Sequence, residues 1–275
     1  QGFSCETQLI LTVHDWASVI NSRGQVDAIL LDFSKAFDKV SHSKLLTKLQ
    51  SYGIRGKTLY WITAFLHHRH QFVSVNGSHS EVVPVTSGVP QGSVLGPTLF
   101  LLFINDIVNY SNSTLRLFAD DCILYRKIES SADQEVLNLD LENLYTWSKT
   151  WQMSFNTTKC KILSITNKRN TDPFPYKLDD VHLEHVESHR YLGVTCNNQL
   201  QWSEHSYNVA NKANRTLGIV RRVLKPCDAK VKSRAYENLV RPQLEYASAA
   251  WSPYYDNAIY KLEQVQRNAA RFVTG

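Results

Sequence analysis

Three aspartates, Asp32, Asp120 and Asp121, have the setting that best suits chemistry in this chain. Each stands among Leu, Ile and Phe residues that favour burial, so each carboxylate needs a partner. Carboxylates that are brought together repel one another unless they share a proton or a cation bridges them. Mg²⁺ prefers a few carboxylates together with water and phosphate oxygens, and two such ions about 3.5 to 4 Å apart can activate a hydroxyl and stabilise a leaving phosphate oxygen. The residue types therefore permit two-metal phosphoryl chemistry.

The same aspartates also have a purely structural interpretation. Asp-Asp is a favourable turn dipeptide, and Asp32 is well suited to the start of a helix. Spacing alone leaves both interpretations open, because two-metal chemistry needs acids from separate strands in one place.

The hydrophobic pattern predicts the elements that would bring the carboxylates together. Residues 26–33 form an apolar run too short for a helix, which predicts a buried strand that delivers Asp32 at its end. Short apolar strands at 115–119 and 122–125 are joined through the Asp-Asp pair and predict a tight hairpin.

The rest of the chain is predicted to mix helices and strands up to about residue 200 and to be helical afterwards. Helices are expected at 9–23, at 44–52 with Ser43 as cap, and at 57–66, 98–108 and 132–151. Strands are expected at 162–165 and 191–195, and a hairpin is expected of 71–75 and 81–85 around Asn76-Gly77. After Trp202 we expect only helices, divided near Pro226, Pro242 and Pro253. A mixed-sheet domain with an appended helical lobe is the simplest architecture.

Composition narrows the class of protein. With 275 residues, 43% of them hydrophobic, the chain is neither collagen-like nor largely disordered. It has no apolar stretch near the 20 residues of a membrane span. Five cysteines without a CxxC pair indicate reduced thiols in an intracellular protein and argue against structural zinc. We expect the protein in the nucleus, the cytoplasm or both. Because the chain lacks an initiator Met, we expect an excerpt of a longer protein.

Positive charge is concentrated near the C-terminus. Residues 201–275 hold 12 Lys and Arg against 6 Asp and Glu, whereas residues 1–200 hold 18 against 19. Seven of these cations alternate with apolar residues on predicted helices: Arg215, Arg221, Arg222, Lys225, Lys230, Lys232 and Arg234. Such basic faces suit phosphate backbones, but charge alone equally fits a solvated helical surface.

Three strings in this order resemble reverse transcriptases of non-LTR (LINE-type) retrotransposons. They are LLDFSKAFDKV at 30–40, SGVPQGSVLGPTLFLLFINDI at 87–107 and LFADDCILY at 117–125. The resemblance continues in WQMSFNTTKCKIL at 151–163 and HRYLGV at 189–194, and the C-terminal tail is similar to that of jockey-like elements.

The resemblance implies an α+β fold of right-hand polymerase type. We expect a palm with a ferredoxin-like, mixed or antiparallel sheet and partial fingers at 1–200, with finger-like parts near 1–25 and 54–88. An all-helical basic thumb is expected at 201–275. The family's basic residues that hold the triphosphate belong to an upstream segment, which we expect outside this chain.

The resemblance also assigns roles around the carboxylates. Asp32, Asp120 and Asp121 would hold two Mg²⁺ ions, with Mn²⁺ as a possible substitute, joined by the main-chain carbonyl of Phe33. Phe37 would lie under the sugar of the incoming nucleotide and select dNTPs; the alternative is an ordinary core aromatic.

Further residues follow the same resemblance. Gln91 would reach the incoming nucleotide and the template, with Gly92 allowing close backbone approach. Lys159 would stabilise or protonate the leaving pyrophosphate. Tyr191, Leu192 and Gly193 would form the primer grip, and the seven thumb cations would contact duplex phosphates without reading sequence.

The function implied is RNA-directed DNA polymerisation in retrotransposition, with an RNA template, a DNA primer and dNTPs as partners and no membrane. The alternative is a non-catalytic nucleic-acid-binding remnant of such a polymerase. The sequence does not indicate an oligomeric state.

Overall fold

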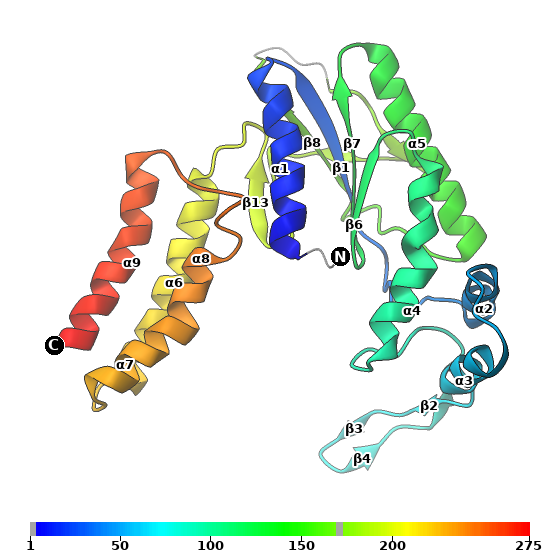
Figure 1. The fold of residues 1–275 in the computed structure, drawn as a ribbon, viewed down its shortest axis with the longest axis horizontal. Helices are drawn as coiled ribbons and strands as arrows, with labels where there is room; N and C mark the ends of the chain where they lie inside the picture. Colours follow the sequence, from blue (N-terminus) through cyan, green and yellow to red (C-terminus); the bar gives the residue numbers. More distant parts are fainter. Residues whose placement is uncertain (1–3, 169–172) are drawn as a thin grey trace. The chain divides into compact units, whose positions relative to one another are not determined.

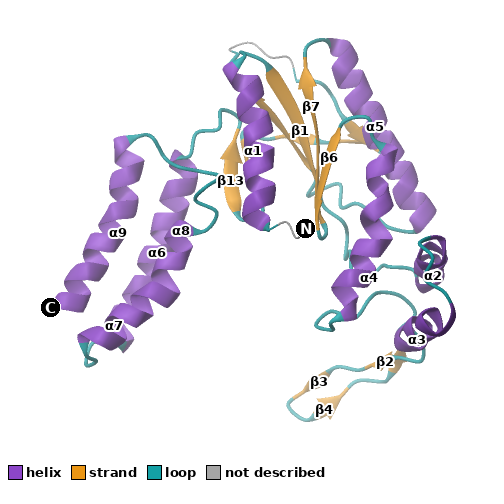
Figure 2. Ribbon diagram, in the orientation of Figure 1, coloured by secondary structure: helices purple, strands orange, loops and turns teal. Residues whose placement is uncertain are grey.

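A computed structural model of the chain describes residues 4–168 and 173–275 and shows mixed helices and strands (Figure 1; Figure 2). The helices are α1 (Cys5–Asn21), α2 (His42–Ser51), α3 (Gly56–Leu66), α4 (Leu95–Ile104), the 3₁₀ helix η1 (Asn105–Tyr110), α5 (Ser131–Trp151), α6 (Ser203–Val223), α7 (Ala229–Ala235), the π-helix η2 (Tyr236–Val240), α8 (Arg241–Glu245) and α9 (Asp256–Thr274). None of the helices in the described ranges is long and apolar enough to cross a membrane.

A five-stranded sheet has the order β11 (Glu184–His185), β8 (Lys161–Thr166), β1 (Gln25–Leu31), β7 (Asp121–Ile128), β6 (Thr114–Phe118). Four two-stranded ribbons accompany it: β2 (His70–Gln71) with β5 (Val83–Pro84), β3 (Ser74–Val75) with β4 (Ser78–His79), β9 (Lys177–Leu178) with β10 (Val181–His182), and β12 (Ser188–Tyr191) with β13 (Val194–Asn197). All seven residues of β1 are buried, including the polar Gln25 and Asp27, whose side chains hydrogen-bond to each other at 2.9 Å. The mixed α and β class predicted from the sequence is confirmed.

By internal contacts the chain divides into two compact units. One comprises Gln1–Asp27, Leu163–Asp172 and His185–Gly275, and we call it the outer unit; the other, Ala28–Ile162 with Pro173–Glu184, we call the central unit. The sequence suggested a boundary near residue 200, assigned to palm and thumb; the contacts group the chain differently, and the functional labels stay predictions.

The central unit has one large apolar core. Side chains from β1, α2, α4, η1, β7 and α5 meet in it, and its largest fully buried members include Trp147, Phe100 and Phe103. Helix α5 packs against β7 (Figure 2), and a capping box between Ser130 and Asp133 fixes its start. This core holds the ends of β1 and β7, where the predicted catalytic residues lie.

The helices of the outer unit have a core of their own. Ala210, Ala213 and Leu217 of α6 meet Leu244 of α8 and Val265 of α9, and α6 lies alongside α8 and α9 (Figure 1). Small residues on α6 allow this close approach, while its charged residues remain on the outside.

The structure corrects three local predictions. The strand predicted at 191–195 is a hairpin, because Leu192 and Gly193 adopt positive φ of 44° and 85° and reverse the chain. Helix α2 begins at His42 rather than after Ser43, and its N-cap residue, Ser41, makes no side-chain cap bond.

Pro242 does not divide a helix as predicted. Residues 229–245 are continuously helical, with the π-helix η2 directly before the proline. The Arg241 N–H donates to the Tyr236 carbonyl across this widened turn, and Pro242, which has no N–H to donate, follows it directly.

Candidate active site

The three predicted carboxylates lie in the central unit, at the ends of adjacent strands of the sheet. Asp32 directly follows β1, and Phe118 pairs with Asp121 across the β6–β7 hairpin, so the turn is Ala119-Asp120. Ala119 has a positive φ of 52°, which the tight hairpin requires. The turn is thus one residue earlier than the sequence suggested, and Asp121 is the first residue of β7.

Backbone hydrogen bonds hold the segment of Asp32 to residues 154–160. The Asn156 N–H donates to the Asp32 carbonyl at 2.7 Å, and the Ser34 N–H donates to the Ser154 carbonyl at 2.8 Å. This pattern makes Phe33 and Phe155 a non-hydrogen-bonded antiparallel pair, which directs the N–H and C=O of Phe33 away from that partner. The Phe33 carbonyl, predicted as a metal ligand, is therefore not used in this pairing.

Sequence reasoning missed Cys160 as a supporting residue. The Asp32 N–H donates to its Sγ at 3.4 Å, and burial raises the pKa of the Cys160 thiol to about 11, so the sulfur stays neutral next to the carboxylate. No local signal marked it, because Cys160 stands between Lys159 and Lys161 in the WQMSFNTTKCKIL string and a lone cysteine has no recognisable spacing.

Electrostatics link the three carboxylates. Partial desolvation raises the pKa of Asp121, and the charges of Asp120 and then Asp32 raise it further. Like charges close enough to perturb one another are the arrangement that a cation relieves. The carboxylates therefore share one electrostatic site.

The carboxylates and the Phe33 carbonyl are donor types that suit Mg²⁺, although they do not form a complete coordination shell. Across residues 4–168 and 173–275, no three His, Cys, Asp or Glu side chains form a group that could hold a metal ion. Carboxylate oxygens and a backbone carbonyl are nonetheless the oxygen donors that Mg²⁺ takes, and it usually completes its shell with water and substrate phosphates. The residues fit the ion in chemistry and leave part of its shell to other ligands.

Lys159 extends toward Asp32. Its Nζ lies 3.8 Å from Asp32 Oδ1, and both side chains are substantially exposed. An exposed ion pair of this length contributes little stability, so its interest lies in bringing a cation to the carboxylate site.

Phe37 combines the two interpretations that the sequence left open. Its ring stacks on the fully buried Phe100, with centroids 4.4 Å apart, and it packs against the core while remaining partly exposed. One face is thus a core contact, while part of the side chain remains at the surface.

The loop that carries Gln91 is fastened to the segment after Phe37. The Gly88 N–H donates to the Val40 carbonyl and the Val89 N–H to the Phe37 carbonyl, both at 2.8 Å. Gly88 has a φ of +89°, and a Cβ there would lie 2.8 Å from the Asp38 carbonyl oxygen, so only glycine fits. Gly92 has a φ of +81° with open space around it, so conformation, not crowding within the chain, requires glycine there.

A cavity of about 520 Å³ adjoins this loop. Exposed Gln91 borders it together with Lys35, Arg69 and Asp38. Neither Lys35 nor Arg69 was predicted as a site residue: Lys35 lies between Asp32 and Phe37 within the 30–40 string, and Arg69 lies among three histidines at 67, 68 and 70.

The predicted primer-grip residues form the tip of the β12–β13 hairpin in the outer unit. Tyr191 and Leu192 are buried, and Gly193 is half-buried. The Tyr246 hydroxyl donates to the Leu192 carbonyl at 3.0 Å, and a Cβ on Gly193 would lie 3.1 Å from the Tyr246 ring. Tyr246, which sequence reasoning missed, holds this turn in place.

Replacing Gly193 with alanine is expected to destabilise the protein by about 1–3 kcal/mol, because alanine disfavours φ of +85° and would press on Tyr246. Gly218→Ala is the matched control: it lies within α6 with open space around it and is expected to stabilise by about 0.5–1 kcal/mol. Urea unfolding of both variants measures the difference. Equal effects of the two substitutions would show that the hairpin tolerates a side chain at this position.

Six of the seven predicted backbone-binding cations are exposed in the outer unit: Arg215, Arg221, Arg222, Lys225, Lys230 and Arg234. Lys232 is half-buried, with its Nζ 5.1 Å from the centroid of the Phe272 ring. It therefore contributes to helix packing through a cation–π contact.

Comparisons with known proteins agree with this arrangement. Residues 6–196 match the family described as "Reverse transcriptase (RNA-dependent DNA polymerase)". The chain is 27% identical over its full length to the probable RNA-directed DNA polymerase from transposon X-element of Drosophila melanogaster, covering 31% of that protein. It is 28% identical to the RNA-directed DNA polymerases of mobile element jockey from Drosophila melanogaster and Drosophila funebris, over 89% and 98% of this chain and 28% and 30% of theirs.

The chain thus spans about three tenths of the length of these curated relatives. The family match covers the β1 end, the Gln91 loop, the β6–β7 hairpin and Lys159 within one continuous stretch. With the carboxylates gathered on adjacent strands and most of its length matched, the chain belongs to the reverse transcriptase family.

Proposed function

We propose that this chain is the polymerising part of an RNA-directed DNA polymerase of a non-LTR retrotransposon, which adds dNTPs to a primer 3′-hydroxyl on an RNA template. The observation that carries the proposal is the placement of Asp32, Asp120 and Asp121 at the ends of adjacent strands, where burial and then the charges of Asp120 and Asp32 raise the pKa of Asp121. Family membership adds the reaction class to this geometry. Base pairing, rather than protein side chains, would choose each nucleotide.

Two Mg²⁺ ions are the cofactors that this site would take. The three carboxylates and the Phe33 carbonyl would hold them, and when bound the ions would supply positive charge beside the attacking hydroxyl and the departing pyrophosphate. The segment 154–156 contributes by fixing the backbone on both sides of Phe33.

Side chains of this chain would then orient the nucleotide and stabilise the charge that develops on the leaving pyrophosphate. Lys159, 3.8 Å from Asp32, would stabilise the negative charge that develops on the pyrophosphate or donate a proton to it. Gln91 would contact the incoming nucleotide. Lys35 and Arg69, which border the same cavity as Gln91, would attract its phosphates.

We further propose the polymerase labels for the parts of the chain. Residues 1–200 would be a palm with partial fingers, and residues 201–275 a thumb whose exposed cations track the duplex. The support for this is that the sheet and its carboxylates precede residue 200 and that a separate helical core with basic outer faces follows it. Seen this way, the excess of positive charge after residue 200 serves phosphate binding.

The test of the proposal is primer extension by this chain on poly(rA)·oligo(dT) with Mg²⁺. Template-dependent incorporation of dTTP that stops when the metal is chelated is the expected result. Retained, salt-sensitive duplex binding without incorporation would instead favour the alternative of a non-catalytic binding module.

Phe37→Val is expected to relax the choice of sugar. The phenyl ring is held against Phe100, so shortening it opens space where a 2′-hydroxyl would lie. We expect incorporation of rUTP relative to dTTP to rise by about tenfold or more, measured by single-nucleotide extension. An unchanged ratio would assign Phe37 to the core alone.

A further inference from the structure

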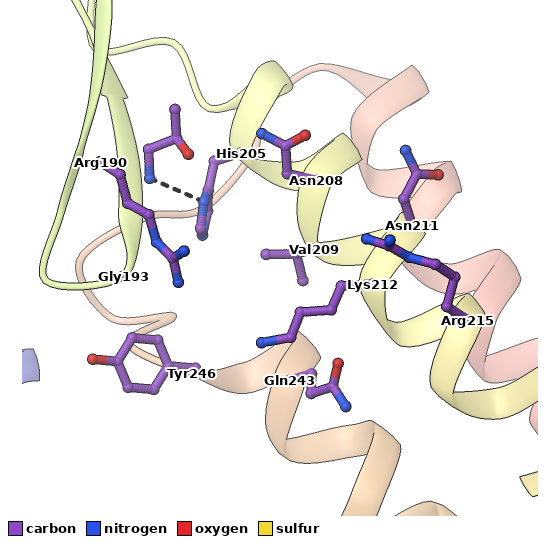
Figure 3. Close-up of a pocket in the computed structure, with 11 residues that line it drawn as sticks. Arg190, Gly193, His205, Asn208, Val209, Asn211, Lys212, Arg215, Gln243 and Tyr246 are labelled. Carbon is purple, nitrogen blue, oxygen red and sulfur yellow. Dashed lines mark hydrogen bonds between the residues drawn. The ribbon is translucent and has the colours of Figure 1, made fainter. Parts of the chain in front are cut away.

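The outer unit contains a cavity of about 650 Å³, and of the residues that line it only Gly193 and Arg215 have a role proposed above. The hairpin β12–β13 borders it on one side, and helices α6 and α8 with the following Tyr246 border it on the others (Figure 3). Every residue that lines it belongs to the outer unit.

The cavity is lined by cations and by no carboxylate. Arg190 reaches in from β12, and Lys212 and Arg215 from α6, together with the amides of Asn208, Asn211 and Gln243. Within the described parts of the chain, Arg190, Lys212 and Arg215 form no ion pair. Three unneutralised cations around one hollow create a positive potential that favours an anionic ligand.

A buried histidine gives the cavity a fixed hydrogen-bond donor. The Thr195 N–H donates to His205 Nδ1 at 3.1 Å (Figure 3), so Nδ1 carries no proton. Burial, and then the charge of Arg190, lower the pKa of His205 to about 4, so the ring is neutral at pH 7 and Nε2 bears the hydrogen.

This donor has no partner. His205 is 3% exposed, and among the described residues its Nε2 meets no hydrogen-bond acceptor. The ring is held in place at 4.3 Å from Trp251, edge to face. A buried donor without an acceptor costs free energy of about 1–3 kcal/mol, and Figure 3 shows this imidazole bordering the same space as Arg190 and Lys212. An acceptor-rich ligand would recover that free energy.

We infer that this cavity binds a single phosphate group of a nucleic acid backbone, held by Arg190 and Lys212 with Arg215 at its edge and His205 Nε2 as a neutral donor. The inference rests on the proposed function for its source of phosphate. The hairpin tip at Gly193 borders the same cavity, so a strand whose backbone lies along that tip can place one phosphate in it. The contacts are of the kind that fix a strand's register without reading its sequence.

The first experiment uses inorganic phosphate as the probe. In uniformly ¹⁵N-labelled protein, the His205 signal is assigned through the coupling between the Thr195 nitrogen and His205 Nδ1 across their hydrogen bond. Phosphate is expected to shift the His205 Nε2 resonance saturably, and Arg190→Met with Lys212→Met to weaken this binding about tenfold or more. The control is Arg271→Met on α9, which removes one positive charge outside the cavity and is expected to leave the shift unchanged.

The second experiment replaces free phosphate with a 12-base-pair RNA–DNA duplex. The duplex is expected to shift the same resonance, and the double variant to lower both duplex affinity and its salt dependence, by about one unit of slope for each phosphate that the variant no longer binds. No shift with either probe, or an equal shift in the double variant, would overturn the inference. A response to phosphate but not to the duplex would exclude a nucleic acid as the source.

The outcome is separable from that of the proposed function. The variant with Asp120→Asn and Asp121→Asn should lose incorporation yet keep the His205 shift, because those residues lie in the other unit. A chain that never incorporates dNTPs but retains the shift would refute the polymerase proposal alone.

Discussion

Primer extension by the chain carrying Asp120→Asn together with Asp121→Asn should fall by about a thousandfold or more, because the site would lose two of the three carboxylates proposed to hold the metals. Asparagine preserves the size of both side chains and the hairpin turn. The matched control is Asp180→Asn, another exposed carboxylate of the central unit, which should extend primers at the rate of the unmodified chain.

In metal-free buffer the same double variant should lose activity but gain folding stability. The pKa of Asp121 is raised by partial burial, Asp120 and Asp32, so its ionisation costs folding free energy as pH rises through the range in which aspartates titrate. The double variant is therefore expected to gain stability relative to the unmodified chain between about pH 4 and 7. Thermal unfolding across that range measures this gain.

Magnesium should stabilise the unmodified chain more than the double variant. A ligand that binds only the folded chain raises its melting temperature, so Mg²⁺ is expected to raise that of the unmodified chain by about 2–4 °C and that of the double variant not at all. If the double variant kept polymerase activity, or if magnesium stabilised both chains equally, the carboxylates would have only the structural role that spacing also permitted.

Lys48→Met is the substitution expected to cost the most stability, about 3–5 kcal/mol. The Lys48 side chain is 3% exposed and paired with Asp106, and its ammonium also donates to the Phe103 carbonyl at 2.6 Å. It lies 3.7 Å from the centroid of the Trp151 ring, with Phe103 and Trp147 rings at 4.8 Å. Removing it leaves the partly buried charge of Asp106 without its partner.

A second variant separates the stability lost through the unpaired Asp106 charge from the stability lost through altered packing. Adding Asp106→Asn removes the unpaired charge while keeping an acceptor for the Trp147 Nε1, which donates to Asp106 at 3.1 Å. The combined variant is expected to recover about 1–3 kcal/mol of the loss in urea unfolding. Lys44→Met, one turn earlier in α2 and half-buried, is the control and should cost under about 1 kcal/mol.

The pH dependence gives an independent readout. Burial lowers the pKa of Lys48 from 10.5 to about 8 in the folded chain, partly offset by Asp106. Between these values the unfolded state holds more protons, so stability rises with pH. From pH 7.5 to 9.5 the unmodified chain should gain about 2 kcal/mol over the variant with Lys48→Met and Asp106→Asn. A constant difference across this interval would mean that Lys48 titrates normally.

Local elements could be predicted from the sequence wherever periodicity or turn chemistry was strong. The apolar run before Asp32 forms most of β1, and the Asn76-Gly77 hairpin is formed with positive φ at both residues. Helix α5 begins one residue before its predicted start and ends at its predicted last residue. These features depend on the backbone preferences of residues that are adjacent in the sequence. The three family strings also sufficed to identify the family.

Tertiary structure alone decided what meets across long sequence separations. No local pattern predicts that Asp32 is fastened to Cys160 and Asn156, 128 and 124 residues later, or that Tyr246 closes on Leu192 and Gly193. The buried Lys48 and the cavity around His205 likewise arise from packing between elements. A residue's own neighbours set its backbone preference, whereas its burial, pKa and partners are set by whichever distant segments the core brings against it.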